Sequence, residues 1–229
     1  MEATALVTGG TGGLGSAVTE AFLATGWRVV VPWVEPRELE RVQARDGLEL
    51  VEADLFEPAA VVAAVELAAA EPAVPLRAVV NLVGGYAGGA KVAEAPVEDF
   101  ERQLRLNLRP TYLATQAGLP HLVRAGGAVV CVSSRAAVQP FSGAAGYITA
   151  KAAVLAFAQA VAAEYKHDGV RCNAVLPSVI DTPANRAAQP DADYSRWVPP
   201  AQVAGVIRFL CSEESAPVSG APVPVYGRA

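Results

Sequence analysis

The stretch Ala5-Leu6-Val7-Thr8-Gly9-Gly10-Thr11-Gly12-Gly13-Leu14-Gly15 joins a short apolar run to a segment with helical spacing. Five of the eight residues from Thr8 to Gly15 are glycine. Glycine permits positive φ and lets the backbone approach a ligand closely, and the start of the following helix offers unpaired N–H groups to a pyrophosphate. A glycine-rich turn between a strand and a helix therefore predicts a dinucleotide-binding site rather than a purely structural turn.

Beyond this turn, short runs rich in Val and Leu alternate with longer segments of helical spacing. We expect strands at Ala5–Val7, Val29–Val31, Leu48–Val51, Ala78–Leu82, Ala128–Val132 and Val170–Leu176. We expect helices at Leu14–Ala24, Ala59–Ala70, Val97–Leu106, Tyr112–Arg124 and Ala150–Tyr165. Strands that are apolar on both faces and separated by helices fit a parallel sheet covered on both sides. The sequence predicts a doubly wound, Rossmann-type parallel sheet in a three-layer α/β/α fold.

The chain is expected to form a single domain over residues 1–229. It is 52% hydrophobic and 18% charged, unlike disordered chains, and no repeat or linker marks a second domain. Residues 177–200 contain five prolines and no sustained periodicity. Because a long connection after the sixth strand lies beside the ligand crevice of a parallel sheet, we expect residues 177–200 to be a substrate loop.

Charge and residue spacing argue against several kinds of partner. The net charge is -5, whereas nucleic-acid-binding proteins normally carry a basic patch. The N-terminus lacks a signal-peptide pattern, and apolar stretches are interrupted before membrane-spanning length, so we expect a cytoplasmic protein with no membrane partner. The three cysteines are widely spaced and predict buried, reduced thiols. His121 and His167 have no neighbouring ligand at metal spacing, so no metal site is predicted and a metal hydrolase is set aside.

Tyr147 and Lys151 stand four residues apart in an Ala-rich helical segment, which places both side chains on one face. A nearby ammonium stabilises a phenolate and is expected to lower the tyrosine pKa toward a value useful for proton transfer. Ser133 and Ser134 follow the fifth predicted strand, whose carboxyl end points into the crevice. A serine hydroxyl there can hold a substrate oxygen as negative charge develops on it.

In combination, these features resemble the short-chain dehydrogenase/reductase family over nearly the whole chain. The resemblance includes the spacing of Thr8–Gly15 and the sequence Asn81-Leu82-Val83-Gly84, which is similar to the family's Asn-Asn-Ala-Gly. It implies an NAD(P)-dependent oxidoreductase that moves hydride between the cofactor and a carbonyl or alcohol substrate. The catalytic residues that it implies are Asn107, Ser134, Tyr147 as general acid/base, and Lys151.

The same resemblance implies where the cofactor binds. The expected contacts lie in the glycine loop, after several strands and on the tyrosine helix: Gly9, Thr11, Gly12, Gly13, Leu14, Gly15, Trp33, Asp54, Leu55, Asn81, Gly84, Tyr147, Lys151, Pro177, Ile180 and Thr182. Trp33 occupies the family's acidic position after the second strand, while Glu35 can reach ribose oxygens and Arg37 a 2′-phosphate. The loop lacks the basic residue typical of many NADP-preferring relatives, which favours NAD over NADP.

Several alternatives remain open at this point. The segments 176–186 and 190–197 are similar to the dihydropteridine reductase branch of the family, which makes a pterin reductase the second hypothesis. Tyr194 and Trp197 in that region can wall a ring, or Trp197 can simply pack the loop onto the body. A regulatory protein that binds NAD(P) without turnover is a third hypothesis, which the intact catalytic set disfavours. By resemblance, we expect a homotetramer or homodimer.

Overall fold

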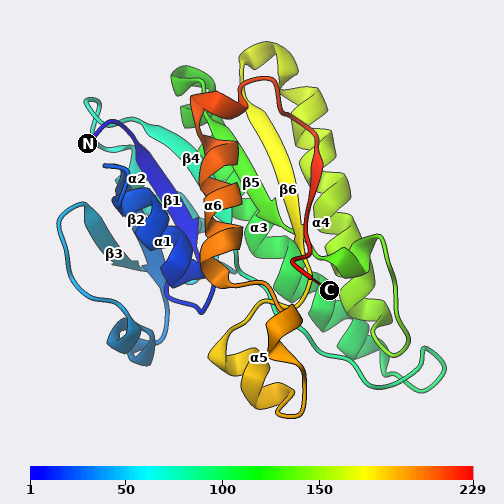
Figure 1. Cartoon of the computed structure of the whole chain (residues 1–229). Helices are drawn as coiled ribbons and strands as arrows, with labels where there is room; N and C mark the ends of the chain where they lie inside the picture. The colour runs from blue at the N-terminus through cyan, green and yellow to red at the C-terminus, as the bar shows by residue number, and fades with distance from the viewer. Residues whose placement is uncertain (229) are drawn as a thin grey trace.

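A seven-stranded parallel sheet forms the middle layer of the computed structural model, which describes residues 1–228 except for the side chain of Arg41 (Figure 1). The strands lie in the order β3-β2-β1-β4-β5-β6-β7, and all neighbouring pairs are parallel. Their bounds are β1 (Thr4–Thr8), β2 (Arg28–Trp33), β3 (Leu48–Glu52), β4 (Leu76–Asn81), β5 (Ala128–Val132), β6 (Arg171–Pro177) and β7 (Pro222–Val225). The predicted parallel sheet is confirmed.

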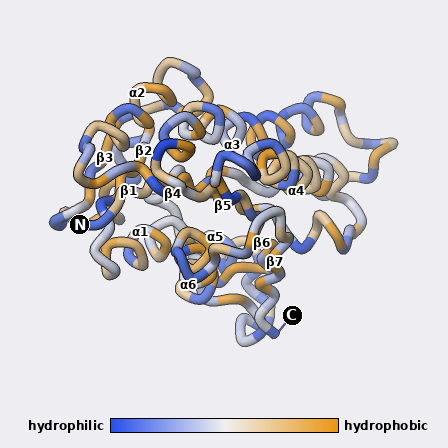
Figure 2. Tube along the Cα trace, turned by 90° about the horizontal axis from the view of Figure 1, so that it is seen from above, coloured by the Kyte–Doolittle hydropathy of each residue, from blue (hydrophilic) through white to orange (hydrophobic). Residues whose placement is uncertain are grey.

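Helices cover both faces of this sheet (Figure 2). On one face lie α2 (Pro58–Ala69), α3 (Val97–Ala125) and α4 (Ala145–Glu164). On the other lie α1 (Gly15–Leu23) and α6 (Pro200–Cys211). Each layer packs its apolar side chains against one side of the strands. The three-layer, single-domain α/β/α architecture agrees with the prediction.

The strand sequences explain why the sheet is covered on both sides. Successive residues of a strand point to opposite faces, and here both sets are apolar. In β1, Leu6 joins the core beneath α2, α3 and α4, whereas Ala5 and Val7 join the core beneath α1 and α6. In β4, Val79 and Val80 divide in the same way. Because both faces of the strands are buried, consecutive residues along each strand are apolar, which is the pattern from which the strands were predicted.

The strand order reverses at β1, which has β2 on one side and β4 on the other. In such sheets ligands bind beyond the carboxyl ends of the strands at the reversal point. Thr8 at the end of β1 is the register partner of Asn81 at the end of β4. The Thr8 hydroxyl also accepts a hydrogen bond from the backbone N–H of Leu82 at 3.1 Å. These contacts bring the glycine loop and the segment after β4 side by side.

Two helices differ from the predicted bounds. The break expected between Leu106 and Tyr112 is wrong, because α3 continues through Pro110 and Pro120. Pro110 lacks an N–H for the helix ladder, but it is buried in the helix layer, and packing of α3 against the sheet outweighs that loss. Helix α4 begins at Ala145, five residues earlier than expected, so Tyr147 lies in its first turn. Although α4 has the length and composition of a membrane span, it packs on the sheet as a core helix of the α/β/α layers.

The C-terminal part of the chain contains elements that the sequence did not predict. Residues 177–200 include the short helix α5 (Pro183–Ala188) and a 3-10 turn at Tyr194–Arg196, so this connection is less irregular than expected. Strand β7 was missed because Pro222 and Pro224 argue against a strand. Proline is tolerated there because β7 is at the edge of the sheet, where one side of the strand forms no ladder.

Candidate active site

The glycine loop is held against the start of α1 at a distance that excludes side chains. A Cβ atom on Gly15 would lie 1.9 Å from the carbonyl oxygen of Gly9, well inside any real contact. Gly9 itself has a φ of 69°, a conformation that favours glycine. The first turn of α1 therefore begins directly beneath the loop, so the positive end of the helix dipole lies at the loop.

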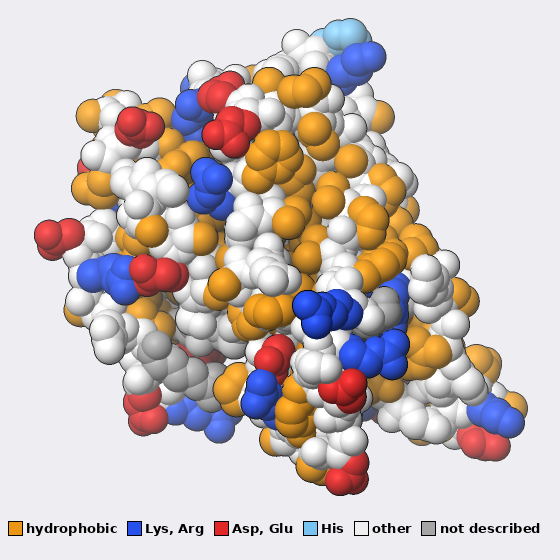
Figure 3. Space-filling view, in the orientation of Figure 1, with side chains coloured by type: hydrophobic (Ala, Val, Ile, Leu, Met, Phe, Trp, Pro, Cys, Tyr) orange, Lys and Arg blue, Asp and Glu red, His pale blue; other side chains and the backbone are white. Residues whose placement is uncertain are grey.

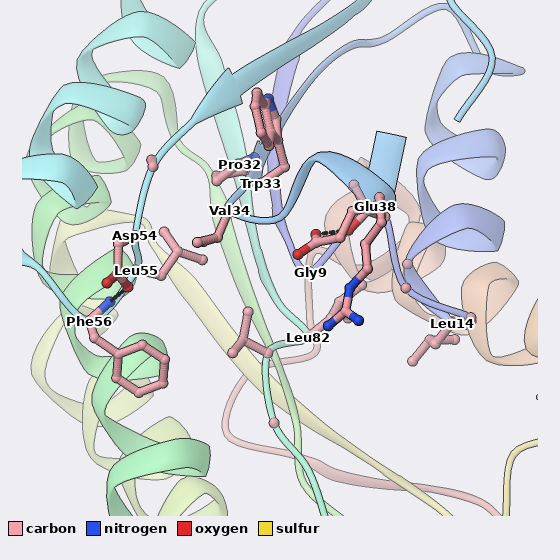
Figure 4. Close-up of a pocket in the computed structure, with 18 residues that line it drawn as sticks. Gly9, Leu14, Pro32, Trp33, Val34, Glu38, Asp54, Leu55, Phe56 and Leu82 are labelled. Atoms are coloured by element: carbon pink, nitrogen blue, oxygen red, sulfur yellow. Dashed lines mark hydrogen bonds between the residues drawn. The ribbon is translucent and has the colours of Figure 1, made fainter. Parts of the chain in front are cut away.

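A cavity of about 670 Å³ opens above this loop (Figure 4). Many of the predicted cofactor-binding residues line it: Gly9, Thr11, Gly12, Gly13, Leu14, Gly15, Trp33, Asp54, Leu55 and Gly84. Arg37, which the sequence suggested for a 2′-phosphate, also lines it, as do residues that were not predicted as cofactor contacts: Pro32, Val34, Glu38, Ala53, Phe56, Leu82 and Val83. These residues lie at or just after the ends of β2, β3 and β4. Their positions in sequence next to predicted contacts could have identified them as cofactor-binding residues.

The rim of this cavity near β2 carries a fixed carboxylate. Glu38, in the 3-10 helix η1 (Pro36–Arg41), accepts a hydrogen bond from the Thr11 hydroxyl at 2.6 Å and one from the backbone N–H of Glu35 at 3.3 Å. In Figure 4 the carboxylate of Glu38 turns toward the glycine loop, whereas the indole of Trp33 points away from it. Arg37 also lines the cavity but is exposed. The polar group nearest the loop is thus one that the sequence analysis did not single out.

The remaining predicted cofactor residues do not line this cavity. Asn81 is buried, and its amide donates to the Thr115 hydroxyl at 2.9 Å, while its Oδ1 has no hydrogen-bond partner among the described residues. Pro177 ends β6, and the Ile180 carbonyl accepts from the Asn185 amide at 2.8 Å. Thr182 lies next to the cavity, since a Cβ on Gly13 would meet its side chain at 3.0 Å.

The two serines after β5 have different environments. The Ser133 hydroxyl is buried and donates to the backbone carbonyl of Lys151 at 2.7 Å, which gives it a structural role. The Ser134 hydroxyl accepts from the N–H of Ala136 at 3.1 Å and lies close enough to the Tyr147 phenol to lower its pKa. Ser134 and Tyr147 are therefore neighbours in the structure.

The pKa of Tyr147 differs from the expected direction. Burial raises the pKa of this phenol above its ordinary value, the hydrogen bond with Ser134 lowers it, and the neighbouring Tyr86 raises it further. The Lys151 ammonium lies 6.0 Å from the centre of the Tyr147 ring and donates instead to the Val132 carbonyl at 2.9 Å. Burial therefore favours the protonated phenol, the form that donates a proton.

Lys151 is a buried cation at the junction between the two halves of the site. Burial lowers the pKa of its ammonium to about 8, and nearby Cys131 acts in the opposite direction. A Cβ on Gly84, which lines the 670 Å³ cavity, would lie 3.1 Å from the Lys151 Nζ. The absence of a side chain at Gly84 therefore leaves the ammonium next to the cavity.

Asn107 fixes the segment that follows Gly84. It lies in α3 and is fully buried. Its Oδ1 accepts from the N–H of Gly85 at 3.1 Å, and its Nδ2 donates to the carbonyls of Gly85 at 3.0 Å and Gln103 at 3.0 Å. A Cβ on Gly84 would lie 2.6 Å from Asn107 Oδ1. The predicted catalytic residues Asn107 and Lys151 thus both face Gly84.

The polar side chains of the predicted substrate loop bind within the loop. Arg186 forms a two-point salt bridge with Asp181, at 2.5 and 2.7 Å, and its guanidinium lies 4.7 Å from the centre of the Tyr194 ring. The Tyr194 hydroxyl donates to the Pro190 carbonyl at 2.9 Å. Trp197 is only 8% exposed and contacts Tyr194 in a tilted arrangement, with ring centres 4.7 Å apart, so it packs the loop onto the body.

Comparison with known proteins gives one family. Residues 3–193 match the family model described as short chain dehydrogenase. The chain is 34% identical to the 2-(R)-hydroxypropyl-CoM dehydrogenase of Xanthobacter autotrophicus, over 99% of this chain and 98% of that protein. A short-chain type dehydrogenase/reductase from Mycobacterium ulcerans has a similar structure, with a TM-score of 0.92, 27% identity and coverage of 100% and 90%. A blue fluorescent protein from a metagenomic library, solved in complex with NADPH, is also similar in structure. Its TM-score is 0.86 at 26% identity, and the match covers 99% of this chain and 98% of that protein.

The burial of Lys151 predicts a variant that is more stable than the natural protein. The folded chain holds the Lys151 proton with a pKa of about 8 against an ordinary 10.5, so between these values the unfolded chain binds more protons and stability rises with pH. Below pH 8 the buried charge is a cost. Lys151→Met removes that cost and is expected to raise the free energy of unfolding at pH 7 by on the order of 2 kcal/mol, after loss of the Val132 hydrogen bond.

Urea unfolding at several pH values measures this effect, with exposed Lys166→Met as the control. The advantage of Lys151→Met over the natural protein shrinks as the pH rises from about 8 toward 10.5, because the natural lysine loses its charge in the folded state. A Lys151→Met variant less stable than the natural protein at pH 7 would refute the assigned cost of burial.

Proposed function

This chain belongs to the short-chain dehydrogenase family and is an NAD(P)-dependent oxidoreductase of alcohol or carbonyl substrates, and we propose that Tyr147 is its proton-transferring residue. The observation that carries this proposal is the proximity of the Tyr147 phenol to Ser134 and to Lys151, whose ammonium adjoins Gly84 in the lining of the cavity. In reduction, the phenol donates its proton to the carbonyl oxygen while the Ser134 hydroxyl holds that oxygen. In oxidation, the same phenolate accepts the proton of the alcohol.

The residues present fit a nicotinamide dinucleotide. A cradle that a Cβ at Gly15 would fill, the first turn of α1 and a cavity of about 670 Å³ suit a pyrophosphate and its attached nucleoside. When bound, the nicotinamide supplies or takes up the hydride. We assign to the Lys151 ammonium, adjacent to Gly84 and 6.0 Å from the centre of the Tyr147 ring, the binding of ribose hydroxyls and the stabilisation of negative charge that develops on Tyr147. Asn107 positions the Gly84–Gly85 backbone through its two hydrogen bonds to Gly85.

NAD is the proposed preferred cofactor. Glu38 is half-buried and fixed by two hydrogen bonds next to Thr11, where a carboxylate can accept from ribose hydroxyls and would repel a 2′-phosphate. Arg37 favours a 2′-phosphate, but its exposure weakens that attraction through solvent screening. The fixed carboxylate is therefore assigned the larger effect.

The substrate loop, compartment and assembly belong to the same proposal. Residues 177–200 follow the carboxyl end of β6, and Thr182 reaches Gly13 of the glycine loop, which supports their role as the substrate loop.

Three buried free cysteines suit the cytoplasm. Apolar side chains on α3 and α4, including the neighbouring rings of Tyr112 and Phe157, line an open hollow of about 370 Å³. Figure 3 displays a second apolar area over α6 and β7.

Such surfaces support a homodimer or homotetramer, since monomers seldom expose contiguous apolar patches. Light scattering that gives a monomer mass at micromolar concentration would contradict this part of the proposal. Pterin reduction remains an alternative prediction of the sequence alone. The polar side chains of the loop that suggested it, Asn185 and Arg186, bond to Ile180 and Asp181 and do not favour it further.

Removal of one hydroxyl tests the proton-transfer role. We expect Tyr147→Phe to lower kcat for ketone reduction about 100-fold or more, because the phenol supplies the proton. Cofactor affinity stays within about threefold, because the ring and its packing remain. Tyr165→Phe, at the C-terminal end of α4, is the matched control and retains activity. Steady-state kinetics and cofactor titration measure both effects, and a Tyr147→Phe variant with normal kcat would exclude Tyr147 as the acid.

The cofactor assignment is tested on η1. The natural protein is expected to have a higher kcat/KM with NADH than with NADPH, and Glu38→Gln to reduce that ratio about tenfold through loss of a charge-assisted hydrogen bond. Glu40→Gln lies in the same short helix, is exposed and does not line the cavity, so it leaves the ratio unchanged. A natural preference for NADPH that Glu38→Gln does not alter would overturn the assignment.

A further inference from the structure

Tyr86 packs directly against the proposed proton donor. Its ring centre lies 5.1 Å from that of Tyr147, and the two rings meet edge to face at 84°. The two phenols are close enough for Tyr86 to raise the pKa of Tyr147. Yet Tyr86 is 61% exposed, so most of its ring is available to another molecule. An exposed aromatic ring in contact with Tyr147 is a candidate contact for the substrate.

The position of Tyr86 is fixed by glycines in the surrounding loops. A Cβ on Gly88 would lie 2.7 Å from the Tyr86 hydroxyl and 2.6 Å from the carbonyl of Gly143, so only glycine allows this packing. The N–H of Gly89 donates to the same Gly143 carbonyl at 2.7 Å. On its other side, the Tyr86 segment follows Gly85, which Asn107 holds through two hydrogen bonds. Tyr86 is thus a placed ring and not a freely moving surface side chain.

A second ring extends the same surface. Phe141 is 50% exposed, and its ring centre lies 6.4 Å from that of Tyr86 in a tilted arrangement. Tyr86 comes from the connection after β4 and Phe141 from the connection after β5, so two separate segments contribute to one wall. We call Tyr86 and Phe141 the aromatic wall. Stacking and edge-to-face contacts are most favourable with a flat apolar partner.

Two guanidinium groups from neighbouring segments are bound by other parts of the protein. The Arg186 guanidinium is bound to the Asp181 carboxylate. The Arg135 guanidinium, directly after Ser134, lies 5.8 Å from the centre of the Tyr226 ring. Neither guanidinium is set against the Tyr86 ring. With neither guanidinium against it, the Tyr86 ring offers apolar contact to another molecule.

We propose that Tyr86 is a specificity-determining residue, and that the aromatic wall selects ketones and secondary alcohols whose larger substituent is a flat apolar ring. The proposal rests on the function assigned to Tyr147 above. With the carbonyl oxygen at Ser134 and Tyr147, a ring attached to the carbonyl carbon reaches the exposed face of Tyr86. A short acyclic ketone places too little surface there to gain from the wall.

The test compares acetophenone with butan-2-one as substrates for reduction. The natural protein is expected to show the higher kcat/KM with acetophenone. Tyr86→Ala lowers kcat/KM for acetophenone about tenfold or more, the scale of one lost aromatic contact, while that for butan-2-one changes less than about threefold. Tyr86→Phe keeps the ring and the preference. Phe141→Ala lowers the preference in the same direction.

Failure of this inference differs from failure of the proposed function. The role of the aromatic wall is overturned if Tyr86→Ala lowers kcat/KM equally for both ketones or for neither. It is also overturned if the natural protein shows no preference for acetophenone. Turnover of neither ketone would also overturn the substrate class. The role of Tyr147 fails separately, if Tyr147→Phe stays fully active on whichever ketone is reduced. Because Tyr86 is exposed, its variants are expected to fold, and unchanged cofactor binding verifies this.

Discussion

The close approach of the Gly9 carbonyl to Gly15 is the contact on which the site depends. It places α1 directly under the glycine loop, and any side chain at Gly15 would push the two apart. The same loop carries Gly13, against which Thr182 packs, and Thr11, which binds Glu38. Elements that follow β1, β2 and β6 are therefore positioned relative to one another by a single turn. The cavity exists because backbone, rather than side chains, forms its floor.

Gly84 lies between this cavity and the side chains of Asn107 and Lys151. The sheet register brings the ends of β1 and β4 together, and Asn107 and Lys151 then approach Gly84 from α3 and α4. Burial has opposite effects on the two titrating groups: it raises the pKa of Tyr147 and lowers that of Lys151 to about 8. Both groups lie in environments that disfavour their charged forms. At pH 7 only Lys151 carries a charge, so only its burial lowers the stability of the fold.

Sequence patterns predicted the parts of this structure that follow from periodicity and local chemistry. The six apolar strands and the glycine turn are of this kind. The break predicted in α3 was wrong because Pro110 weakens a helix locally while tertiary packing retains it. Strand β7 was missed because proline is acceptable only at an edge, which sequence does not reveal. The expected lowering of the Tyr147 pKa considered one charge and not burial, and Glu38 and Tyr86 acquire their roles from contacts with Thr11 and Tyr147 that are distant in sequence.

The central claim is that the hydroxyls of Ser134 and Tyr147 bind the oxygen that becomes the alcohol. A crystal structure with oxidised cofactor and an unreacted alcohol tests it directly. We expect the alcohol oxygen within hydrogen-bond distance of both hydroxyls, with the reacting carbon facing the nicotinamide and the pyrophosphate at the start of α1. An alcohol oxygen bound elsewhere, with Tyr147 in contact only with protein, would contradict the account.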